Sequence, residues 1–209
     1  MTDSSPLSSP RRRRTAAAAG HTGDEAGARA CLGDADPGVR ATALGALGRL
    51  GVLAADDLAA ALSDSDPALR RRACELAVPL VAVDLIVMLG DEDPLVAETA
   101  AWALGEREEG SAVGALAAMA TGHADALCRE AAVAALGAIG DPAGLPAILT
   151  ATTDKPAVRR RAVLALAPFE GPEVDAALEH ALQDRDWQVR QAAEDLTVSP
   201  SEAEPPRRA

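Results

Sequence analysis

One short motif recurs six times along this sequence, and it restricts the chain to a repetitive fold. Its anchor is an apolar residue, Val39 in the first copy, which is followed by Arg40. The later anchors are Leu69, Val96, Cys128, Val158 and Val189. Successive anchors are therefore 30, 27, 32, 30 and 31 residues apart. Self-similarity at a period of this size predicts small structural units that stack on one another.

Most copies contain the signals of a helix start. Asp36 lies three residues before the first anchor, and Pro37 follows it directly. An Asp side chain at this position accepts a hydrogen bond from a free helix N–H group, and Pro at the next position loses no helical bond. Apolar residues then recur at helical spacing, and a shorter apolar stretch precedes the Asp. Each repeat is therefore predicted to consist of a first helix, a tight turn and a second helix.

The composition favours an all-α class. With two Trp, one Phe and no Tyr, the core is left mainly to Ala and Leu. Such small and unbranched side chains suit helices that approach one another closely. One hairpin cannot bury its apolar face alone, so neighbouring hairpins must stack. We therefore expect an all-α solenoid, an α-α superhelix of about six helical hairpins, over residues 23–197.

Both ends of the chain are expected to lie outside this solenoid. Residues 1–22 are rich in Ser, Pro and Arg and have no apolar period, and residues 198–209 contain three Pro. Both compositions are typical of disordered tails. The basic run Arg11–Arg14 is either a solvated segment or a tether to an acidic partner, to nucleic acid or to the acidic body of the protein itself.

The motif also resembles a known repeat family. The segment Asp34–Arg40 has the pattern D-x-D-P-x-V-R, and an A-L-G sequence follows it. This pattern is similar to the HEAT repeat, in the short form named after phycobilisome lyase-like proteins. The resemblance extends roughly over residues 24–197 and is specific for the fold, but the same repeat serves scaffolds, adaptors and a few enzymes.

The resemblance implies a ladder of polar contacts between neighbouring repeats. In the family, the first Asp of the turn and the Arg after the anchor form this ladder. The matching pairs are Asp34 with Arg40, Asp64 with Arg70 and Asp184 with Arg190. Three repeats depart from the pattern, with Ala97, His123 and Thr153 at the corresponding positions. The ladder is therefore expected to be weakest in the middle of the chain.

The charge is unevenly distributed. The net charge is -12, although residues 1–22 contribute +3 and the last eleven residues contribute nothing. The intervening body therefore carries about -15, by subtraction. A body this acidic repels phosphate backbones, so nucleic acid is not expected to bind the folded part.

The sequence also bears on the compartment. Cys31, Cys74 and Cys128 are odd in number and far apart, which does not fit a disulfide framework. The segment after the arginine run is too short and too polar for an export signal, and no apolar run reaches transmembrane length. We therefore expect a cytoplasmic protein without a membrane partner.

The second helices offer a candidate binding surface. A step of 100° per residue places one row of residues opposite the apolar anchors. Second helices line the concave surface of HEAT-like arrays, so the resemblance implies that this row forms its floor. The candidate binding residues are Arg71, Glu75, Glu98, Trp102, Glu130 and Arg160.

The chemistry of this floor indicates a class of partner. Trp102 is either a binding anchor, since Trp is favoured at interface hot spots, or a cover for small residues of a neighbouring helix. An acidic surface with a Trp at its centre suits a protein or peptide with a basic segment. Arginines on either side of the acidic stretch also admit a partner of mixed charge.

No catalytic residue, metal site or cofactor is expected. The enzyme deoxyhypusine hydroxylase, which is HEAT-like, holds iron with His-Glu dipeptides, but none of His21, His123 and His180 precedes a Glu. Cys128 occupies an anchor and is expected to be buried and inert, whereas Cys74 lies at the edge of the concave side. The favoured function is a non-enzymatic scaffold or adaptor. The alternatives are a bilin lyase-like subunit, implied by the repeat subclass, and a HEAT-like DNA glycosylase, which would need a basic groove.

Overall fold

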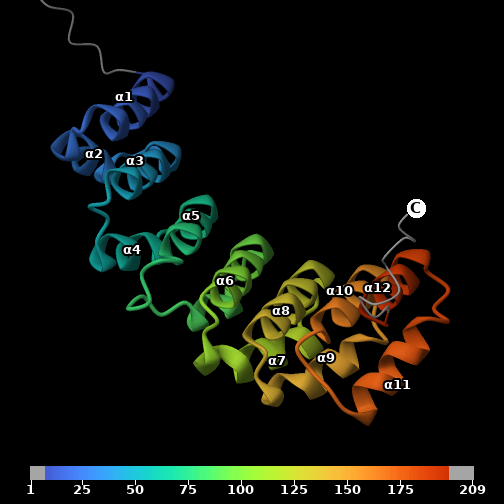
Figure 1. Ribbon diagram of the computed structural model, residues 1–209. Coiled ribbons are helices and arrows are strands. Elements are labelled where there is room, and N and C mark those ends of the chain that lie inside the picture. Colours follow the sequence, from blue (N-terminus) through green and yellow to red (C-terminus); the bar gives the residue numbers. More distant parts are fainter. Residues whose placement is uncertain (1–7, 198–209) are drawn as a thin grey trace, which may run out of the picture. The chain divides into compact units, whose positions relative to one another are not determined.

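The computed structural model describes residues 8–197, and the helices in Figure 1 lie in that range. All regular structure in these residues is helical. The all-α solenoid class predicted from the repeats is therefore confirmed. The chain divides into two compact units, Met1–Ala103 (unit 1) and Leu104–Ala209 (unit 2), and each is described by itself.

Unit 1 consists of second helices backed by shorter first helices (Figure 1). Helix α3 packs against both α1 and α5, so these three second helices lie side by side. The first helix α2 packs against α3, and α4 packs against α5. The elements are α1 (Ser9–Thr22), α2 (Glu25–Ala30), η1 (Cys31–Gly33), α3 (Pro37–Leu50), α4 (Ala55–Leu62), α5 (Pro67–Ala77), η2 (Ile86–Gly90) and the first ten residues of α6 (Pro94–Glu106).

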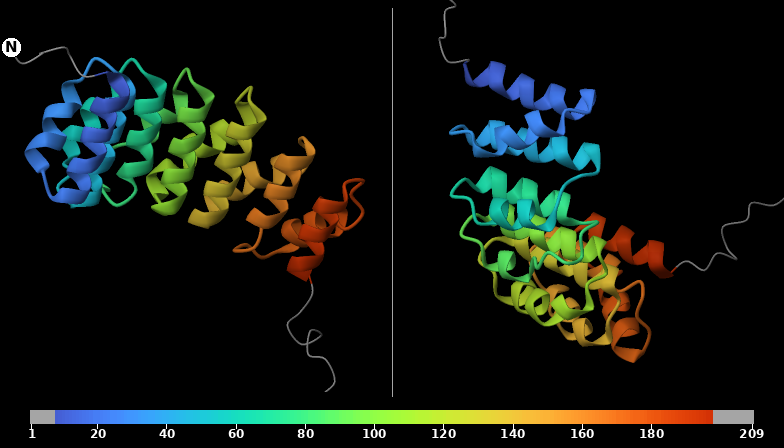
Figure 2. Two further views of the ribbon diagram at one scale, coloured as in Figure 1. Left: turned by 90° about the horizontal axis from the view of Figure 1, so that it is seen from above. Right: turned by 90° about the vertical axis from the view of Figure 1, so that its left-hand side faces the viewer.

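Unit 2 repeats the same arrangement (Figure 2). Helix α10 packs between α8 and α12, which places three second helices next to one another. The first helix α7 packs against α8 and α9, and α11 packs against α12. The elements are η3 (Gly110–Ala112), α7 (Val113–Gly122), α8 (Ala126–Ile139), η4 (Pro142–Gly144), α9 (Leu145–Ala151), α10 (Pro156–Ala165), α11 (Pro172–Ala181) and α12 (Trp187–Thr197).

The second helices begin at the Asp residues that the motif marks. The Asp36 carboxylate accepts hydrogen bonds from the backbone N–H groups of Gly38 (2.8 Å) and Val39 (3.3 Å). Asp125 accepts one from Leu127 (2.9 Å) in the same way. These contacts satisfy N–H groups that have no partner inside the helix, so each Asp fixes where its helix starts.

Small residues allow the second helices of unit 2 to pack closely. A methyl group added to Gly137 would lie 2.7 Å from the Cα of Ala165, and one added to Gly105 would lie 2.9 Å from the Cα of Ala135. Both neighbouring atoms belong to the backbone, so they cannot turn aside. This is why Ala and Gly occupy these helix faces.

The expectation of a disordered tail over residues 1–22 is wrong for residues 9–22. These residues form α1, which packs along α3 and buries Ala16, Ala19 and Gly20. Gly20 permits the contact, because a methyl group there would lie 2.9 Å from the Cα of Ala46. Side chains this small left no apolar period in the sequence. Residues 1–7 and the predicted tail 198–209 lie outside the described residues.

The third repeat departs from the predicted hairpin. Its first helix is replaced by the 3-10 helix η2, consistent with the short step of 27 residues between Leu69 and Val96. Leu85 and Leu89 of this segment are buried, whereas Val87 is exposed. The other repeats within the described range have an α-helix at this place.

Candidate functional site

Ion pairs connect successive repeats within each unit, and we call each of them a rung. In unit 1, Nε of Arg70 donates to Oδ2 of Asp91 (2.8 Å) and Nη2 donates to Oδ1 (2.7 Å). In unit 2, Arg159 contacts Asp184 in the same way, at 2.8 and 2.7 Å. The other rungs are Arg12–Asp34, Arg40–Asp64 and Arg129–Asp154.

The partners within these rungs differ from the expected ones. The resemblance pairs Asp34 with Arg40, Asp64 with Arg70 and Asp184 with Arg190. In the structure, Arg40 donates to the main-chain oxygen of Asp34 (2.8 Å) and to the carboxylate of Asp64 (2.7 Å). Arg70 bonds the carbonyl of Asp64 (2.9 Å), and Arg190 bonds that of Asp184 (2.7 Å). The fork-shaped guanidinium can bond its own turn with one nitrogen and the next repeat with another, so the carboxylate partner comes from the following repeat.

Two of the three departures lie at the centre of the chain. Ala97 has no donor and cannot form a rung. His123 takes part of the role of the turn Asp, because its Nδ1 accepts a hydrogen bond from the N–H of Asp125 (3.1 Å). Its main-chain oxygen accepts a bond from Arg129 (2.8 Å), as the turn carbonyls do elsewhere.

At the third departure, Thr153, the neighbouring residue supplies the carboxylate of the rung. The carboxylate of Asp154, one residue later, accepts two bonds from Arg129, at 2.6 and 2.8 Å. Its Oδ1 also accepts a bond from the N–H of Lys155 (2.6 Å). The carboxylate of this turn therefore lies one residue later in the sequence, and the rung to Arg129 still forms.

The rungs keep their carboxylates ionised. Hydrogen bonds from Arg70 hold the pKa of Asp91 below its usual value, although burial alone would raise it. Arg159 lowers the pKa of Asp184 for the same reason. A carboxylate that a fixed partner holds in its charged form contributes to the stability of the folded state. The rungs therefore join successive repeats through charged side chains.

Four of the six predicted binding residues lie in unit 1. Arg71 and Glu75 are one turn apart on α5, with Nε of Arg71 3.8 Å from Oε1 of Glu75. Oε2 of Glu75 also accepts a 2.7 Å bond from Arg72. Glu98 and Trp102 are one turn apart on α6, so they share a helix face. Arg71 and Trp102 are exposed, and the two glutamates are half-buried.

Trp102 lies on the exposed face of α6, whereas the opposite face of this helix is buried. Its exposed fraction is 46%, whereas Ala101 and Ala103 on either side of it are fully buried. Within residues 8–197, Glu98 has no ion-pair partner. The surface of α6 thus presents an indole beside an uncompensated carboxylate.

The remaining two predicted residues lie in unit 2. Oε1 of Glu130 on α8 is 3.5 Å from Nη2 of Arg161, so this carboxylate is already engaged by its own unit. Arg160 on α10 is exposed and lines a cavity of about 180 Å³. Trp187, which is 65% exposed, and Asp195 line the same cavity from α12.

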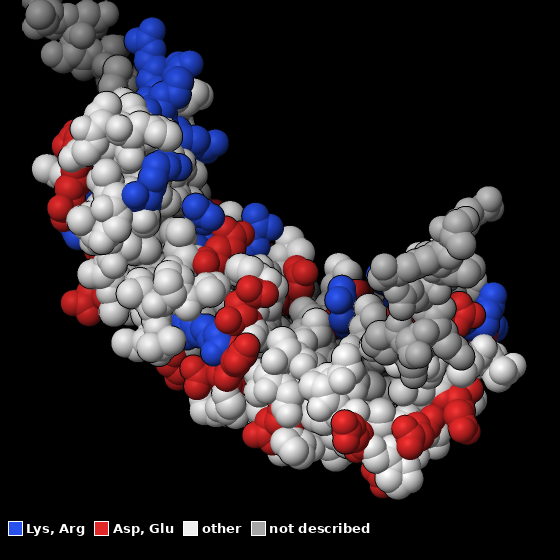
Figure 3. All heavy atoms as spheres, in the orientation of Figure 1, with Lys and Arg blue, Asp and Glu red and all other residues white. Residues whose placement is uncertain are grey.

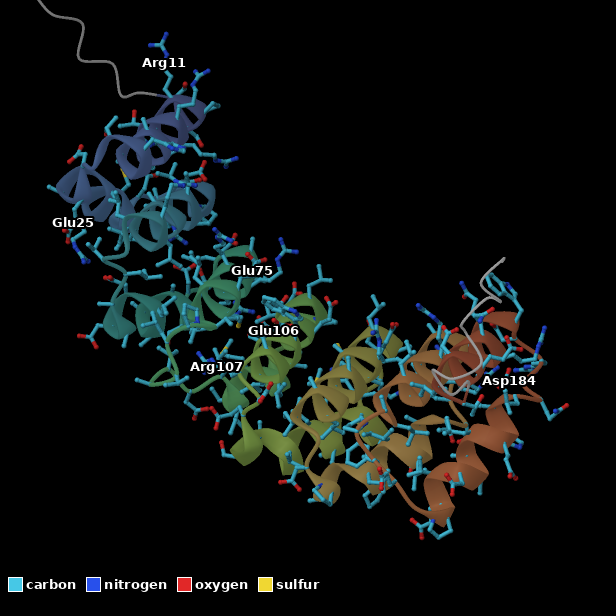
Figure 4. The ribbon with its side chains drawn as sticks, in the orientation of Figure 1. Arg11, Glu25, Glu75, Glu106, Arg107 and Asp184 are labelled. Atoms are coloured by element: carbon cyan, nitrogen blue, oxygen red, sulfur yellow. The ribbon has the colours of Figure 1, made fainter. Side chains whose placement is uncertain are left out.

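The basic residues of unit 1 gather on its second helices. In Figure 3, blue side chains follow one side of α1, α3 and α5, whereas red side chains lie on the other side of these repeats. Figure 4 shows Glu25 at the α2 side of this unit, away from the second helices. A cavity of about 390 Å³ opens on the basic side, and Arg49, Arg71, Arg72 and Glu75 contribute charged side chains to it. We call this cavity the basic cleft.

Sequence reasoning missed two contributors to these surfaces. Arg49 lies near the end of α3, where its position among small residues gave no sign of a cavity. Trp187 could have been noticed, because it occupies the first helical position, where four other repeats have Pro. A residue at that position faces solvent, so a large aromatic side chain there is exposed.

Residues 8–197 contain no cluster of three or more His, Cys, Asp or Glu side chains placed to hold a metal ion. All three cysteines are thiols; Cys74 and Cys128 are buried, and Cys31 is partly exposed. The prediction that Cys128 is buried is therefore confirmed, while Cys74 lies deeper than the edge position expected for it.

No helix in residues 8–197 combines the length and the apolar character needed to cross a membrane.

Two family models match the sequence. The model of HEAT repeats matches residues 82–156, and that of the PBS lyase HEAT-like repeat matches residues 158–184. No curated protein sequence gives a significant match.

Solved structures with a similar fold are numerous. Escherichia coli YibA is 19% identical, with a TM-score of 0.60 over 90% of this chain and 68% of that one. A designed armadillo repeat protein, solved in complex with the peptide (KR)4, is 16% identical, with a TM-score of 0.56 over 90% of this chain and 97% of that one. Human deoxyhypusine hydroxylase is 23% identical over 92% of this chain and 80% of that one, with a TM-score of 0.48.

Proposed function

Because this chain is a HEAT-repeat protein of the PBS lyase HEAT-like subclass, we propose that it is a non-enzymatic scaffold or adaptor. It binds a segment of another protein on its second-helix surface. A cytoplasmic location fits this function, because its cysteines are thiols. Repeat solenoids commonly bind partners on extended surfaces of this kind.

The observation that carries this proposal is the exposure of Trp102. The Trp102 indole is 46% exposed, and the opposite face of its helix is buried. A partner that covers the indole removes its apolar surface from water, which favours binding. Trp residues are strongly enriched among the side chains that dominate binding energy. The other strongly exposed aromatic side chain of residues 8–197, Trp187, lies in unit 2, so Trp102 is well suited to act as the anchor of unit 1.

The charge beside Trp102 indicates the class of segment. Glu98 lies one turn away and lacks an ion-pair partner in residues 8–197. A basic side chain of the partner would contact this carboxylate while an apolar part of the segment covers the indole. A basic peptide is therefore the first probe, and one protein of similar fold was solved with the peptide (KR)4.

The test is affinity capture from native lysate with wild type and the double variant Glu98→Arg, Trp102→Ala. The control is Glu179→Arg, Leu127→Ala, which reverses an exposed carboxylate and removes an exposed apolar side chain in unit 2. We expect a partner that binds wild type and the control but not the α6 variant. Equal capture by all three proteins, with unchanged circular dichroism, would show that this face is not the binding site.

The alternative is a bilin lyase-like subunit. The match of residues 158–184 to the PBS lyase HEAT-like repeat favours it. Transfer of a bilin to an acceptor protein in the presence of this chain would replace the scaffold proposal.

A further inference from the structure

The net charge of this protein conceals a basic surface. Outside the rungs, α1, α3 and α5 carry Arg11, Arg13, Arg14, Arg49, Arg71 and Arg72 against the single carboxylate of Glu75. Of the acidic residues in the turns, Asp36 lies 3.5 Å from Arg13, whereas the acidic side chains of the first helices lie on the other side in Figure 3. A ligand that approaches the second helices of unit 1 therefore meets a positive local field, although the whole chain is acidic.

The basic cleft is the hollow part of this surface. Arg49 reaches it from α3, and its guanidinium forms no hydrogen bond or ion pair with another described residue. Arg71 comes from α5 and has only a long contact to Glu75, at 3.8 Å. The shorter bond of Glu75, at 2.7 Å, goes to Arg72. Two guanidinium groups of the cleft are thus available to an incoming anion, and such groups bind carboxylates with paired hydrogen bonds.

A second cavity adjoins the basic cleft. It measures about 280 Å³, and Glu75 lines both cavities, so they are neighbours along α5. Its walls are mainly apolar, from Leu53, Leu76, Pro79 and Leu80. We call it the apolar pocket. A cavity of this kind accepts one aliphatic or aromatic side chain.

The spacing of the two cavities defines the ligand. Arg72 of the basic cleft and Leu76 of the apolar pocket are four residues apart on one face of α5, which corresponds to about 6 Å along its axis. In an extended peptide, residues i and i+2 point to the same side and lie about 7 Å apart. An acidic side chain and an apolar side chain separated by one residue would therefore reach the two cavities together.

We propose that the basic cleft and the apolar pocket bind an extended acidic peptide segment with an acid-x-apolar pattern. This goes beyond the proposed function, because it gives another part of the second-helix surface, on α3 and α5, a segment of the opposite charge from the one proposed for α6. A polyanion such as single-stranded nucleic acid suits the site less well. The described second helices of unit 1 before α6 place no aromatic side chain there for base stacking.

The experiment measures fluorescence anisotropy of a labelled synthetic peptide with the segment Asp-Asp-Ser-Leu between Gly-Ser flanks. The variant is Arg49→Glu, Arg71→Glu, and the control is Lys155→Glu, Arg185→Glu, which changes the net charge equally at exposed positions of unit 2. We expect saturable binding to wild type and the control, and roughly ten-fold weaker binding to the variant, because two exposed ion pairs are replaced by repulsion. The pair Arg49→Gln, Arg71→Gln serves as a milder version if the charge reversal disturbs folding.

Two further arms can overturn the proposal. A peptide with Ser in place of Leu should bind several-fold more weakly, and equal binding would exclude the apolar pocket. An oligothymidylate of equal length that binds more tightly at physiological salt would make the cleft a phosphate site instead. The proposal is also excluded if the peptide does not bind wild type. It is excluded as well if the Arg49→Glu, Arg71→Glu variant and the Lys155→Glu, Arg185→Glu control bind the peptide equally. The Glu98→Arg, Trp102→Ala variant should keep the peptide, so the failure of this inference is distinguishable from that of the α6 binding site.

Discussion

Arg70 and Asp91 form a two-point ion pair in which Nε and Nη2 donate to the two carboxylate oxygens at 2.8 and 2.7 Å. The two side chains are only 9% and 7% exposed. The same guanidinium also bonds the carbonyl of Asp64 at 2.9 Å. One Arg side chain therefore holds its own turn and the next repeat together, and it does so where water cannot replace its partner.

Removing one member of this pair should destabilise unit 1 strongly. Asp91→Ala leaves the Arg70 guanidinium buried without its carboxylate and also removes a 2.9 Å bond to the N–H of Asp93. We expect a loss of about 3 kcal/mol in the free energy of unfolding, measured by urea denaturation. The control is Glu25→Ala, whose partner Arg29 is exposed, and it should change little. Equal effects of the two variants would mean that burial of the rung does not matter.

Stability should fall in acid because of the same rungs. The pKa of Asp91 is lowered by Arg70, and that of Asp154 is lowered by Arg129. The folded state then binds fewer protons than the unfolded chain, whose Asp residues titrate near about 3.9. The rungs therefore contribute fully above that pH, and their contribution is lost as the pH falls through the lower folded values.

The measurement is the urea midpoint between pH 7 and pH 2.5. We expect a plateau near neutral pH and a decline below about pH 5. Asp91→Asn should have a lower plateau and a shallower decline, since it lacks one of the titrating groups. A midpoint that is constant or rises in acid would contradict the role assigned to these carboxylates.

The change in stability when a glycine of unit 2 is replaced by Ala should depend on the space around that glycine. Gly137→Ala places a methyl group 2.7 Å from the Cα of Ala165, so the two helices must separate. We expect a loss of about 1–3 kcal/mol by chemical denaturation. Gly114→Ala on α7 meets nothing within 4 Å, and better helix propensity should raise stability by up to about 1 kcal/mol. The opposite order would show that close helix packing is not what selects Gly137.

The repeat could be predicted from the sequence because its signals are local. An Asp at the helix start, such as Asp36, acts on N–H groups two and three residues away. The rungs are different, because they join residues 21 to 25 positions apart through the turn geometry. The sequence pattern therefore identified the residue types but not their partners, and it placed the turn position at Thr153 instead of Asp154.

Helix α1 and the basic cleft could not be predicted from sequence patterns. The buried side of α1 consists of Ala16, Ala19 and Gly20, so its sequence contains no pattern of large apolar residues. The cleft depends on three helices placed side by side, and no single segment contains its charge pattern. Net charge gave the wrong impression of this surface, since charges of opposite sign lie on opposite sides of the repeats.

The docking of α1 can be tested with a matched pair of substitutions. Gly20→Leu introduces a side chain against the Cα of Ala46, whereas Ala18→Leu adds the same side chain at an exposed position of the same helix. We expect Gly20→Leu to lower the melting temperature by roughly 5 °C and Ala18→Leu to leave it unchanged. Hydrogen exchange should show faster exchange of the α1 amides in the first variant only. Slow exchange in both variants would mean that α1 tolerates a wider gap from α3.

Trp102 provides a spectroscopic measure of binding, because the chain has only two Trp. The variant Trp187→Phe leaves Trp102 as the only indole, and its 46% exposure should make its fluorescence accessible to acrylamide. A partner that covers α6 removes water from the ring, so its binding should shift the emission to shorter wavelength and reduce quenching. The reciprocal variant Trp102→Phe reports on Trp187 in unit 2 and should not respond to the same partner. If only Trp187 responds, the partner binds the cavity beside Arg160, and the anchor belongs to α12 instead of α6.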